Sequence, residues 1–309
     1  MDELFVECGI EEDETRPRCE VSVVLAAYNE IGCIKEELDK VRTALETSSF
    51  SYEIIVVDDG SDDGTARVVE EYNCEQVKLI RHRVNQGSGA ARKTGTLAAR
   101  GEFVVWSDVD LTYPNQRIPD LVNHLIHTEA DQVVGARDSE RGTMKILRVP
   151  TKYFIRKLAC FLTGTYIPDL NSGLRAFQKP FVLKYRGILP KGFSFTTTIT
   201  LAALTNSHSI EYLPIDYAAR KGRSKIRPIR DTLGFLALII KTVMYFNPLR
   251  VFYPMTWFVG LGFLASLGYD IFYESPANLG DKTVLLFVAT MQILTLGLFA
   301  DLICKRARL

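Results

Sequence analysis

Two long apolar runs near the C-terminus constrain this chain more than any other feature of its sequence. Residues 251–269 are 19 residues without a charge, and residues 283–300 are 18 more. Each run approaches the roughly 20 residues that a helix needs to cross a hydrocarbon core of ~30 Å. Buried core helices are the alternative, but such helices rarely stay apolar on every face over this length. The runs therefore predict a transmembrane hairpin over 249–309, with spans at about 251–272 and 283–303.

The charges that flank the two runs predict how the hairpin is oriented. Residues 221–230, Arg250 and the tail 305–309 are basic, whereas the connector 270–282 has three acidic residues against one lysine. Positively charged flanks stay on the cytosolic side of a membrane. Both termini and the large N-terminal part are therefore predicted to be cytosolic in an integral, two-span membrane protein.

A third apolar stretch, residues 232–246, lies between these basic residues and the first span. Lys241 interrupts it, and an Asn-Pro pair at 247–248 ends it. A helix with such a mixed face lies in the membrane interface. We expect an interfacial amphipathic helix over 229–248; a third span is the alternative, and it would break the agreement of the flanking charges.

The remaining N-terminal part alternates between two kinds of segment. Short β-branched runs predict buried strands, and stretches with apolar residues on one stripe predict helices. This alternation predicts one α/β domain with a mostly parallel sheet over 20–228. Residues 1–19 are acidic and lack the apolar region of a signal peptide, so a disordered lead-in is expected. The predicted strands are 21–27, 53–57, 77–80, 102–106 and 132–134, and the predicted helices are 30–45, 86–99, 114–127 and one capped by 61–65.

Composition and motifs exclude several function classes. Lys and Arg number 37 and Asp and Glu number 37, so no net field indicates nucleic acid as a partner. No GxGxxG follows the first predicted strand, and no GxxxxGK[ST] occurs anywhere. The domain is therefore predicted to be neither a dinucleotide-binding Rossmann domain nor a P-loop NTPase.

Polar residues follow three of the predicted strands, at 28–30, 58–61 and 108–110. The carboxyl ends of strands are where open α/β sheets bind ligands. Asp108 and Asp110 are two residues apart in an extended segment, so their side chains lie on the same face. Two adjacent carboxylates suit Mg²⁺ or Mn²⁺, which fills its remaining positions with phosphate oxygens and water. A solvated turn is the alternative for such a pair taken alone.

Two further features at these strand ends have open interpretations. Asp58 and Asp59 are able to cap the next helix or to accept hydrogen bonds from a base or a ribose. Gly87 and Gly89 let the backbone approach a ligand closely, or allow tight packing between elements.

Basic residues form a second group. Arg137 follows the strand at 132–134, and Arg148, Lys152 and Arg156 are spaced by four on a predicted helix, hence on one face. Arginine pairs suit a phosphate held in a fixed orientation. The cluster at 220–225 fits either a ligand or anionic lipid headgroups.

Together these residues resemble family-2 glycosyltransferases of GT-A fold, and more narrowly the polyprenyl-phosphate glycosyltransferases, the group that includes dolichyl-phosphate mannose synthase. The ordered motifs span 21–225, and the C-terminal pair of runs is similar to the two-helix anchor of bacterial and archaeal members. The motifs are VSVVLAAYNE, EIIVVDDGSDDGT, NQGSGAARKTGTLAARGE, WSDVDLTYP, DLNSGLRAF and RKGRSKI.

The resemblance implies a role for each matching residue. Asp108 and Asp110 would hold Mg²⁺ or Mn²⁺ on the donor diphosphate, and Asp169 would lie near the sugar. The residues implied for the nucleotide-sugar are Ala26, Tyr28, Glu30, Asp58, Asp59, Gly87, Asp108, Arg220 and Lys225. Those implied for the acceptor phosphate are Arg137, Arg148, Thr151, Ser172 and Ser224, and those for catalysis are Asp169, Arg137, Arg148 and Arg220.

The sequence departs from the family pattern in a few positions. Ala26 and Ala27 replace a common proline and small polar residue, and Ser88 replaces a frequent lysine. Thr112 stands where glutamine often follows the two aspartates, which puts a third protein ligand of the metal in doubt. No QxxRW occurs, so a processive synthase is not indicated.

The implied reaction is an inverting transfer of one sugar from a UDP- or GDP-linked donor to a polyprenyl (dolichyl or undecaprenyl) phosphate at the cytosolic membrane face. A phosphate acceptor is largely dianionic at neutral pH, so positioning and electrostatics matter more than a base. The alternatives are another membrane lipid acceptor, which needs a base, and a non-catalytic nucleotide-sugar-binding protein. The resemblance also suggests a homo-oligomer formed through the hairpin.

Overall fold

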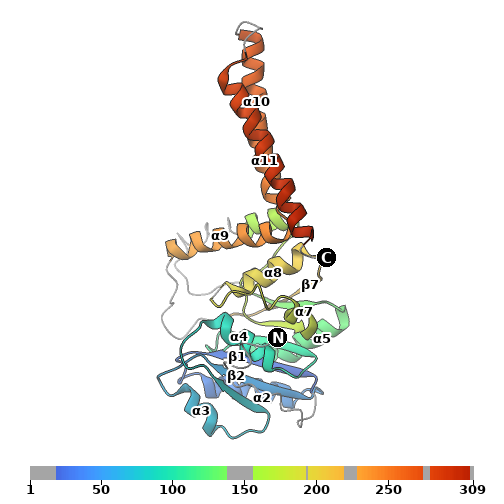
Figure 1. Cartoon of the computed structure of the whole chain (residues 1–309). Coiled ribbons are helices and arrows are strands. Elements are labelled where there is room, and N and C mark those ends of the chain that lie inside the picture. The colour runs from blue at the N-terminus through green and yellow to red at the C-terminus, as the bar shows by residue number, and fades with distance from the viewer. Residues whose placement is uncertain (1–18, 138–155, 193, 219–227, 274–278, 307–309) are drawn as a thin grey trace.

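The computed structural model of the chain describes residues 19–137, 156–192, 194–218, 228–273 and 279–306. The predicted lead-in at 1–19 lies outside this part, apart from Cys19. Within it, a sheet domain, a crosswise helix and a long helical hairpin follow one another along the chain (Figure 1).

The sheet contains seven strands in the order β3-β2-β1-β4-β6-β5-β7. Only β6 runs antiparallel to its neighbours, so the predicted mostly parallel α/β sheet is confirmed. The strands are β1 (Val21–Ala27), β2 (Tyr52–Asp58), β3 (Val77–Arg81), β4 (Phe103–Asp108), β5 (Gln132–Arg137), β6 (Arg175–Gln178) and β7 (Ile210–Ile215).

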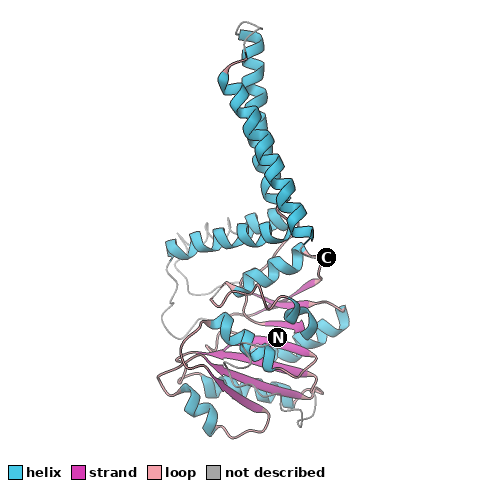
Figure 2. Ribbon diagram, viewed as in Figure 1, coloured by secondary structure: helices cyan, strands magenta, loops and turns pink. Residues whose placement is uncertain are grey.

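Helices cover both faces of the sheet, which Figure 2 shows as magenta strands between cyan helices. One apolar core lies under α2 (Ile34–Glu46) and α5 (Ile118–Thr128), and it includes Leu38 and Leu121. The other lies under α4 (Ser88–Ala98), α7 (Lys179–Lys184) and α8 (Phe195–Thr205), around Trp106. The short elements α3 (Thr65–Glu71) and η1 (Asn115–Arg117) complete the described part of the domain.

The predicted strands all form, but the segment after β5 was not anticipated. β6 has only four residues, too few for a periodic signal. α8 reads FTTTITLAALT and is rich in β-branched threonine, which favours strands over helices. Burial overrides this preference, because nine of its residues, including all four of the threonines at 196–198 and 200, are buried.

α9 (Pro228–Phe246) lies across the sheet domain, and it covers the predicted interfacial segment 229–248 except for its last two residues. Its buried residues Ile239 and Val243 pack with Leu201 of α8 in a third small core. Lys241 and Tyr245 are exposed on its other side. The helix is therefore amphipathic, as expected; its position in a membrane interface stays a prediction.

α10 (Leu249–Tyr273) and α11 (Asp281–Arg306) form the hairpin that rises from the level of α9 (Figure 1). Both are long and apolar enough to cross a membrane, by length and composition, and their surface is largely exposed. At the far end, Asp270 accepts hydrogen bonds from the backbone N–H of Gly280 (2.9 Å) and from the Thr283 hydroxyl (2.6 Å). These bonds tie the start of α11 to the end of α10.

Candidate functional site

The sheet register brings the ends of three strands together. Ala27 of β1 pairs with Asp58 of β2, and Ala26 pairs with Asp108 of β4. Two carboxylates therefore flank the end of β1, at the carboxyl edge where α/β sheets bind ligands. The sheet thus brings the polar residues that follow these strands to one edge, as the sequence predicts.

Asp59, predicted to bind the nucleotide, is hydrogen-bonded within the fold, and its role toward a nucleotide stays a prediction. It is buried, and its carboxylate accepts hydrogen bonds from the backbone N–H groups of Gln86 (3.0 Å) and Gly87 (2.7 Å). Its Oδ1 also lies 2.7 Å from Nδ1 of His82, whose Nε2 lies 2.9 Å from the Thr94 hydroxyl. Burial alone would raise the pKa of Asp59, but the bonds from His82 and the two amides outweigh it and lower that pKa. Asp59 thus fixes the backbone of the glycine loop, residues 86–89, through Gln86 and Gly87.

The glycine loop itself packs against another part of the chain. Gly87 has φ +101°, and a Cβ there would lie 2.5 Å from the Lys191 carbonyl oxygen. A Cβ on Gly89 would lie 2.2 Å from the Pro190 carbonyl oxygen. Of the two interpretations that the sequence left open for these glycines, tight packing is the one that these contacts account for.

Asp58, the neighbouring carboxylate, keeps one oxygen without a hydrogen-bond partner within the described residues. The residue is fully buried, and this oxygen is its Oδ1. A hollow of about 300 Å³ is lined by Gly60, Ser61, Arg81, His82 and Arg83, of which Arg81 pairs with Asp58 in the sheet. Asn29 lies between the predicted ligands Tyr28 and Glu30. Its backbone N–H donates to the Ser61 hydroxyl (2.9 Å), which connects the loop after β1 to this hollow.

The two aspartates after β4 are held by neighbours of different kinds. Asp108 is about one-third exposed and is ion-paired with the buried Arg92 of α4, whose guanidinium also stacks 4.4 Å from the centre of the Phe195 ring. Asp110 accepts a hydrogen bond from the Thr112 hydroxyl (2.5 Å), and Leu111 between them has φ +58°. Thr112 is itself buried, so it supports Asp110 rather than facing a ligand.

These aspartates fit a divalent cation that shares its shell with a ligand. Within the described residues no group of three or more His, Cys, Asp or Glu side chains could hold a metal. Mg²⁺ typically takes one or two protein carboxylates and completes its shell with phosphate oxygens and water. Asp108 and Asp110 supply that number, with Arg92 balancing the charge of Asp108.

Sequence reasoning missed Glu37, which supports the aspartate loop from α2. It is fully buried, and its carboxylate accepts hydrogen bonds from the Leu111 backbone N–H (3.1 Å) and the Asn115 side chain (2.5 Å). Asn115 in turn accepts a hydrogen bond from Ser107 at the end of β4 (2.6 Å). Burial raises the pKa of Glu37 to about 7. A glutamate on the apolar stripe of the helix, beside Leu38, was the available signal.

Asp169 pairs with Arg137, the last residue of β5. Arg137 donates from Nε to Oδ2 (2.7 Å) and from Nη2 to Oδ1 (2.9 Å), and its guanidinium lies 5.1 Å from the Tyr217 ring centre. Burial alone would raise the pKa of Asp169, but Arg137 outweighs it and lowers that pKa. Two residues that were assigned separate roles are therefore one unit.

The loop that carries Asp169 ends against the aspartate site. A Cβ on Gly173 would lie 2.7 Å from Oδ2 of Asp108, and the Gly173 backbone N–H donates to the Tyr113 hydroxyl (2.7 Å). The loop 169–173 therefore joins the Arg137 side of the site to the Asp108 side.

A buried arginine fixes the course of this loop. Arg175 donates to the carbonyl oxygens of Ser172 (2.7 Å) and Leu170 (3.0 Å), and to the Thr200 hydroxyl of α8 (2.6 Å). Burial lowers the pKa of Arg175 to about 10, so it stays charged at neutral pH. Ser172, predicted to bind the acceptor phosphate, is fully buried, and its hydroxyl has no partner among the described residues.

Five predicted site residues lie outside the described part of the chain. They are Arg148, Thr151, Arg220, Ser224 and Lys225. Their roles in holding the two substrates stay predictions.

Comparison with known proteins gives the same assignment for most of the chain. Residues 22–184 match the family model for glycosyl transferase family 2, and residues 247–305 match the model for the GtrB C-terminal hairpin. The first match covers the sheet domain from β1 to α7, and the second covers the α10–α11 hairpin.

Two curated relatives are similar over most of this chain. A dodecaprenyl-phosphate galacturonate synthase of Rhizobium johnstonii is 25% identical over 306 residues, with 93% of this chain and 88% of that protein aligned. A dolichyl-phosphate beta-glucosyltransferase of Trichomonas vaginalis is 36% identical over 244 residues, covering 72% and 71%.

A solved structure shares the fold. Glucosyl-3-phosphoglycerate synthase from Mycobacterium tuberculosis, crystallised with Mn²⁺, uridine-diphosphate-glucose and phosphoglyceric acid, superposes with a TM-score of 0.57 at 18% identity. The match covers 73% of this chain and 80% of the other. At this identity the likeness is one of fold, and it agrees with the predicted GT-A class.

Proposed function

The chain belongs to glycosyl transferase family 2, and from that premise we propose that it transfers one sugar from a UDP- or GDP-linked donor to a polyprenyl phosphate. One observation carries the proposal: the loop 169–173 links the Asp169–Arg137 pair to Asp108. These contacts support a site for the donor diphosphate beside a site for a second anion. The names of the two curated relatives support a polyprenyl phosphate as that anion.

The donor nucleotide binds at the ends of β1 and β2. Asp58 has a carboxylate oxygen without a partner within the described residues, and it pairs in the sheet with Arg81, which lines a hollow together with Arg83. Asp58 accepts the N–H that uracil or guanine offers, while Asp59 holds the loop in place. Tyr28 and Glu30 are the chain neighbours of Asn29, whose backbone N–H donates to Ser61, one of the residues that line this hollow.

The diphosphate lies at the end of β4. Asp108 and Asp110 would hold Mg²⁺ or Mn²⁺ there, and this ion would offset the charge that develops on the leaving diphosphate. Arg92 balances Asp108 from the buried side, so the carboxylate keeps one orientation. Glu37 and Asn115 keep the loop that carries Asp110 fixed.

The acceptor phosphate binds beside Arg137. An oxygen of this phosphate forms the bond to the anomeric carbon as the bond to the diphosphate oxygen breaks, and a single displacement of this kind inverts the anomeric centre. A phosphomonoester has a second pKa near ~6 and needs no strong base at neutral pH. Asp169 is held ionised with both oxygens engaged by Arg137, so it orients the arginine and is not a proton acceptor.

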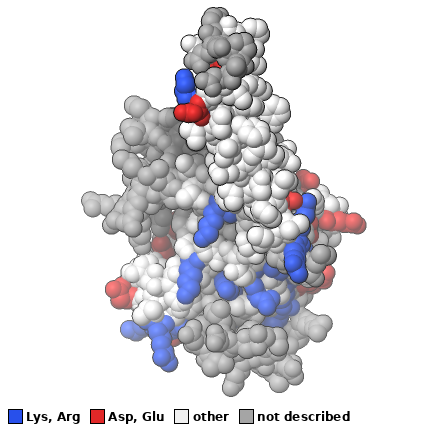
Figure 3. All heavy atoms as spheres, turned by 45° about the horizontal axis from the view of Figure 1, so that its top comes forward, with Lys and Arg blue, Asp and Glu red and all other residues white. Residues whose placement is uncertain are grey.

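The hairpin places this chemistry at a membrane. In Figure 3 its surface is almost free of charge, and Lys and Arg gather around its base. The exposed basic residues there are Lys241, Arg250, Lys305 and Arg306. Such residues stay on the cytosolic side. The sheet domain and both termini are therefore cytosolic in this proposal, and α9 lies in the interface.

Transfer assays with two acceptors test the proposal. The full chain in detergent micelles with Mn²⁺ receives a panel of UDP- and GDP-sugars together with either a polyprenyl phosphate or a diacylglycerol. The proposal expects a glycosylated product with polyprenyl phosphate and none with diacylglycerol. Transfer to diacylglycerol would instead establish a hydroxyl acceptor, and donor binding without transfer to either would establish a binding protein.

A further inference from the structure

Tyr217 lies just beyond the end of β7, two residues after Ile215. β7 pairs in parallel with β5, and the register of this pair sets Ile215 beside Arg137, the last residue of β5. Tyr217 is partly buried and packs against the core under α2 and α5. The chain therefore leaves the sheet next to the arginine to which the proposed reaction assigns the acceptor phosphate.

The ring of Tyr217 holds Arg137 from a second direction. The guanidinium carbon of Arg137 lies over this ring, 5.1 Å from its centre, which is within the roughly 6 Å at which an aromatic face attracts a cation. Asp169 binds the same guanidinium through Nε (2.7 Å) and Nη2 (2.9 Å). Arg137 is thus held by a carboxylate through hydrogen bonds and by an aromatic ring through its face.

The hydroxyl of Tyr217 reaches the loop that carries the predicted metal ligands. It is hydrogen-bonded to the Thr112 hydroxyl, which in turn bonds to Asp110 (2.5 Å). Because a hydroxyl has one hydrogen and a carboxylate only accepts, Thr112 donates to Asp110 and Tyr217 donates to Thr112. The backbone adds a second connection, since the Ala218 N–H donates to the Thr112 carbonyl oxygen (2.9 Å). The segment after β7 is therefore fastened to the aspartate loop.

Tyr113 connects the same ring to the loop 169–173. The rings of Tyr113 and Tyr217 meet edge to face, with centres 5.1 Å apart and planes at 70°. The Tyr113 hydroxyl accepts a hydrogen bond from the Gly173 backbone N–H (2.7 Å). Tyr217 therefore lies where the aspartate loop, the loop 169–173 and Arg137 come together.

We propose that Tyr217 is a positioning residue for sugar transfer: its ring orients Arg137 toward the acceptor phosphate, and its hydroxyl ties that arginine to the loop of Asp110. The acceptor phosphate and the donor diphosphate are both anions, so the groups that hold them must keep one relative geometry. A tyrosine side chain has two rotatable bonds, so a ring held at its face and at its hydroxyl has little freedom. The inference deepens the proposed function and rests on it.

Two substitutions separate the contribution of the ring from that of the hydroxyl. Tyr217→Leu removes both, so the KM for polyprenyl phosphate at saturating Mn²⁺ should rise roughly 2- to 30-fold, the range of a cation–π contact. The KM for the donor should change little. Tyr217→Phe keeps the ring and should leave the KM for polyprenyl phosphate within about twofold of the wild type.

Both variants lose the hydrogen bond to Thr112, and a second measurement detects this loss. Mn²⁺ affinity in the presence of nucleoside diphosphate, followed by paramagnetic resonance, should fall about two- to tenfold in each, as expected for one hydrogen bond. This measurement requires no acceptor. In a Thr112→Val background, Tyr217→Phe should lower the affinity no further, because the bond that the two residues share is already absent.

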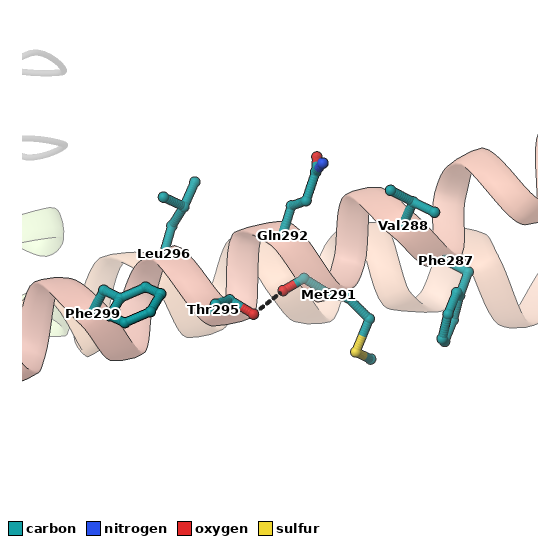
Figure 4. A pocket seen from close by; sticks show the side chains of 7 residues that line it. All are labelled: Phe287, Val288, Met291, Gln292, Thr295, Leu296 and Phe299. Atoms are coloured by element: carbon teal, nitrogen blue, oxygen red, sulfur yellow. Dashed lines mark hydrogen bonds between the residues drawn. The ribbon is translucent and has the colours of Figure 1, made fainter.

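Two matched variants serve as controls. Tyr212 belongs to β7 and is partly buried, and its hydroxyl has no hydrogen-bond partner within the described residues. Tyr212→Phe should therefore leave both measurements unchanged. Phe287→Leu removes an aromatic ring from a shallow hollow on α11, in the hairpin that rises away from the sheet domain (Figures 1 and 4). It should leave the KM for polyprenyl phosphate unchanged.

Several results would overturn the inference. They are an unchanged acceptor KM in Tyr217→Leu, an equal rise of that KM in Phe287→Leu, and an unchanged Mn²⁺ affinity in Tyr217→Phe. Thermal unfolding in the same detergent establishes that each variant is folded, and Tyr217→Phe decides through Mn²⁺ affinity if Tyr217→Leu does not fold. A wild type that transfers to diacylglycerol and not to polyprenyl phosphate would instead refute the proposed function, and the Mn²⁺ measurement would still test the hydroxyl contact.

Discussion

Arg137 and Asp169 face each other as a two-pronged ion pair, although 32 residues separate them in the chain. A planar guanidinium held by both carboxylate oxygens has one orientation, and its remaining N–H groups point in fixed directions. In the proposed reaction these groups meet the acceptor phosphate. The pair therefore converts a flexible arginine into a positioned one, which is what a reaction between two anions requires.

Asp169→Asn is expected to reduce transfer about 100-fold, because the positioning of Arg137 is lost while the nucleotide site is untouched. Donor affinity, measured by calorimetry, should change little. The acid limb of the rate profile near pH ~6 should persist in the variant, since it belongs to the acceptor phosphate. Loss of that limb in Asp169→Asn would show that Asp169 itself titrates in the reaction.

Asp110→Ala is expected to abolish metal-dependent transfer, because one of two carboxylates is then missing. Mn²⁺ affinity in the presence of nucleoside diphosphate, followed by paramagnetic resonance, should fall at least tenfold. Thr112→Val is the graded control: it keeps both aspartates but removes the hydroxyl that bonds to Asp110 and to Tyr217, so a loss of a few-fold is expected. Full metal-dependent activity in Asp110→Ala would contradict the proposed site.

His82→Ala is expected to raise the KM for the donor more than it lowers kcat. His82 contacts Asp59, and Asp59 holds the backbone of Gln86 and Gly87, so the loop beside the nucleotide loosens. The free energy of unfolding should fall by about 1 to 3 kcal/mol, the usual cost of breaking a buried hydrogen-bond network. A kcat effect with unchanged KM would place His82 nearer to the reacting atoms than the fold does.

Glu37 makes the stability of the domain depend on pH. Its pKa is raised by burial to about 7, from 4.5 for an exposed glutamate. The folded state thus holds this proton more tightly than the unfolded state. Its contribution is fully present below about pH 4.5 and is lost as pH rises through about 7.

Glu37→Gln should remove this dependence, which amounts to about 1 to 3 kcal/mol of the free energy of unfolding. Thermal unfolding of both proteins at pH 5 and pH 8 in the same detergent measures it. The wild type should lose more stability than the variant across this window. Parallel curves would mean that the Glu37 carboxyl does not change its charge there.

Local patterns determined much of this protein. β1 forms over the same residues, 21–27, as its β-branched run predicts, because a buried parallel strand needs an apolar side chain at each position. The two long apolar helices of the hairpin follow from length and apolarity alone, and the polar residues at strand ends follow from the chain direction in a parallel sheet. These properties depend on neighbours in the sequence, so the sequence displays them directly.

The tertiary structure decided what each polar group does. Asp58 and Asp59 are adjacent in sequence, yet one has a carboxylate oxygen without a partner among the described residues and the other is fully engaged by His82 and the glycine loop. Glu37 reaches Asn115 across 78 residues, and Arg137 reaches Asp169 across 32. Such pairings depend on which strands become neighbours and in what register. Strand order and register arise from packing of the whole domain, so the local pattern of apolar and polar residues does not predict them.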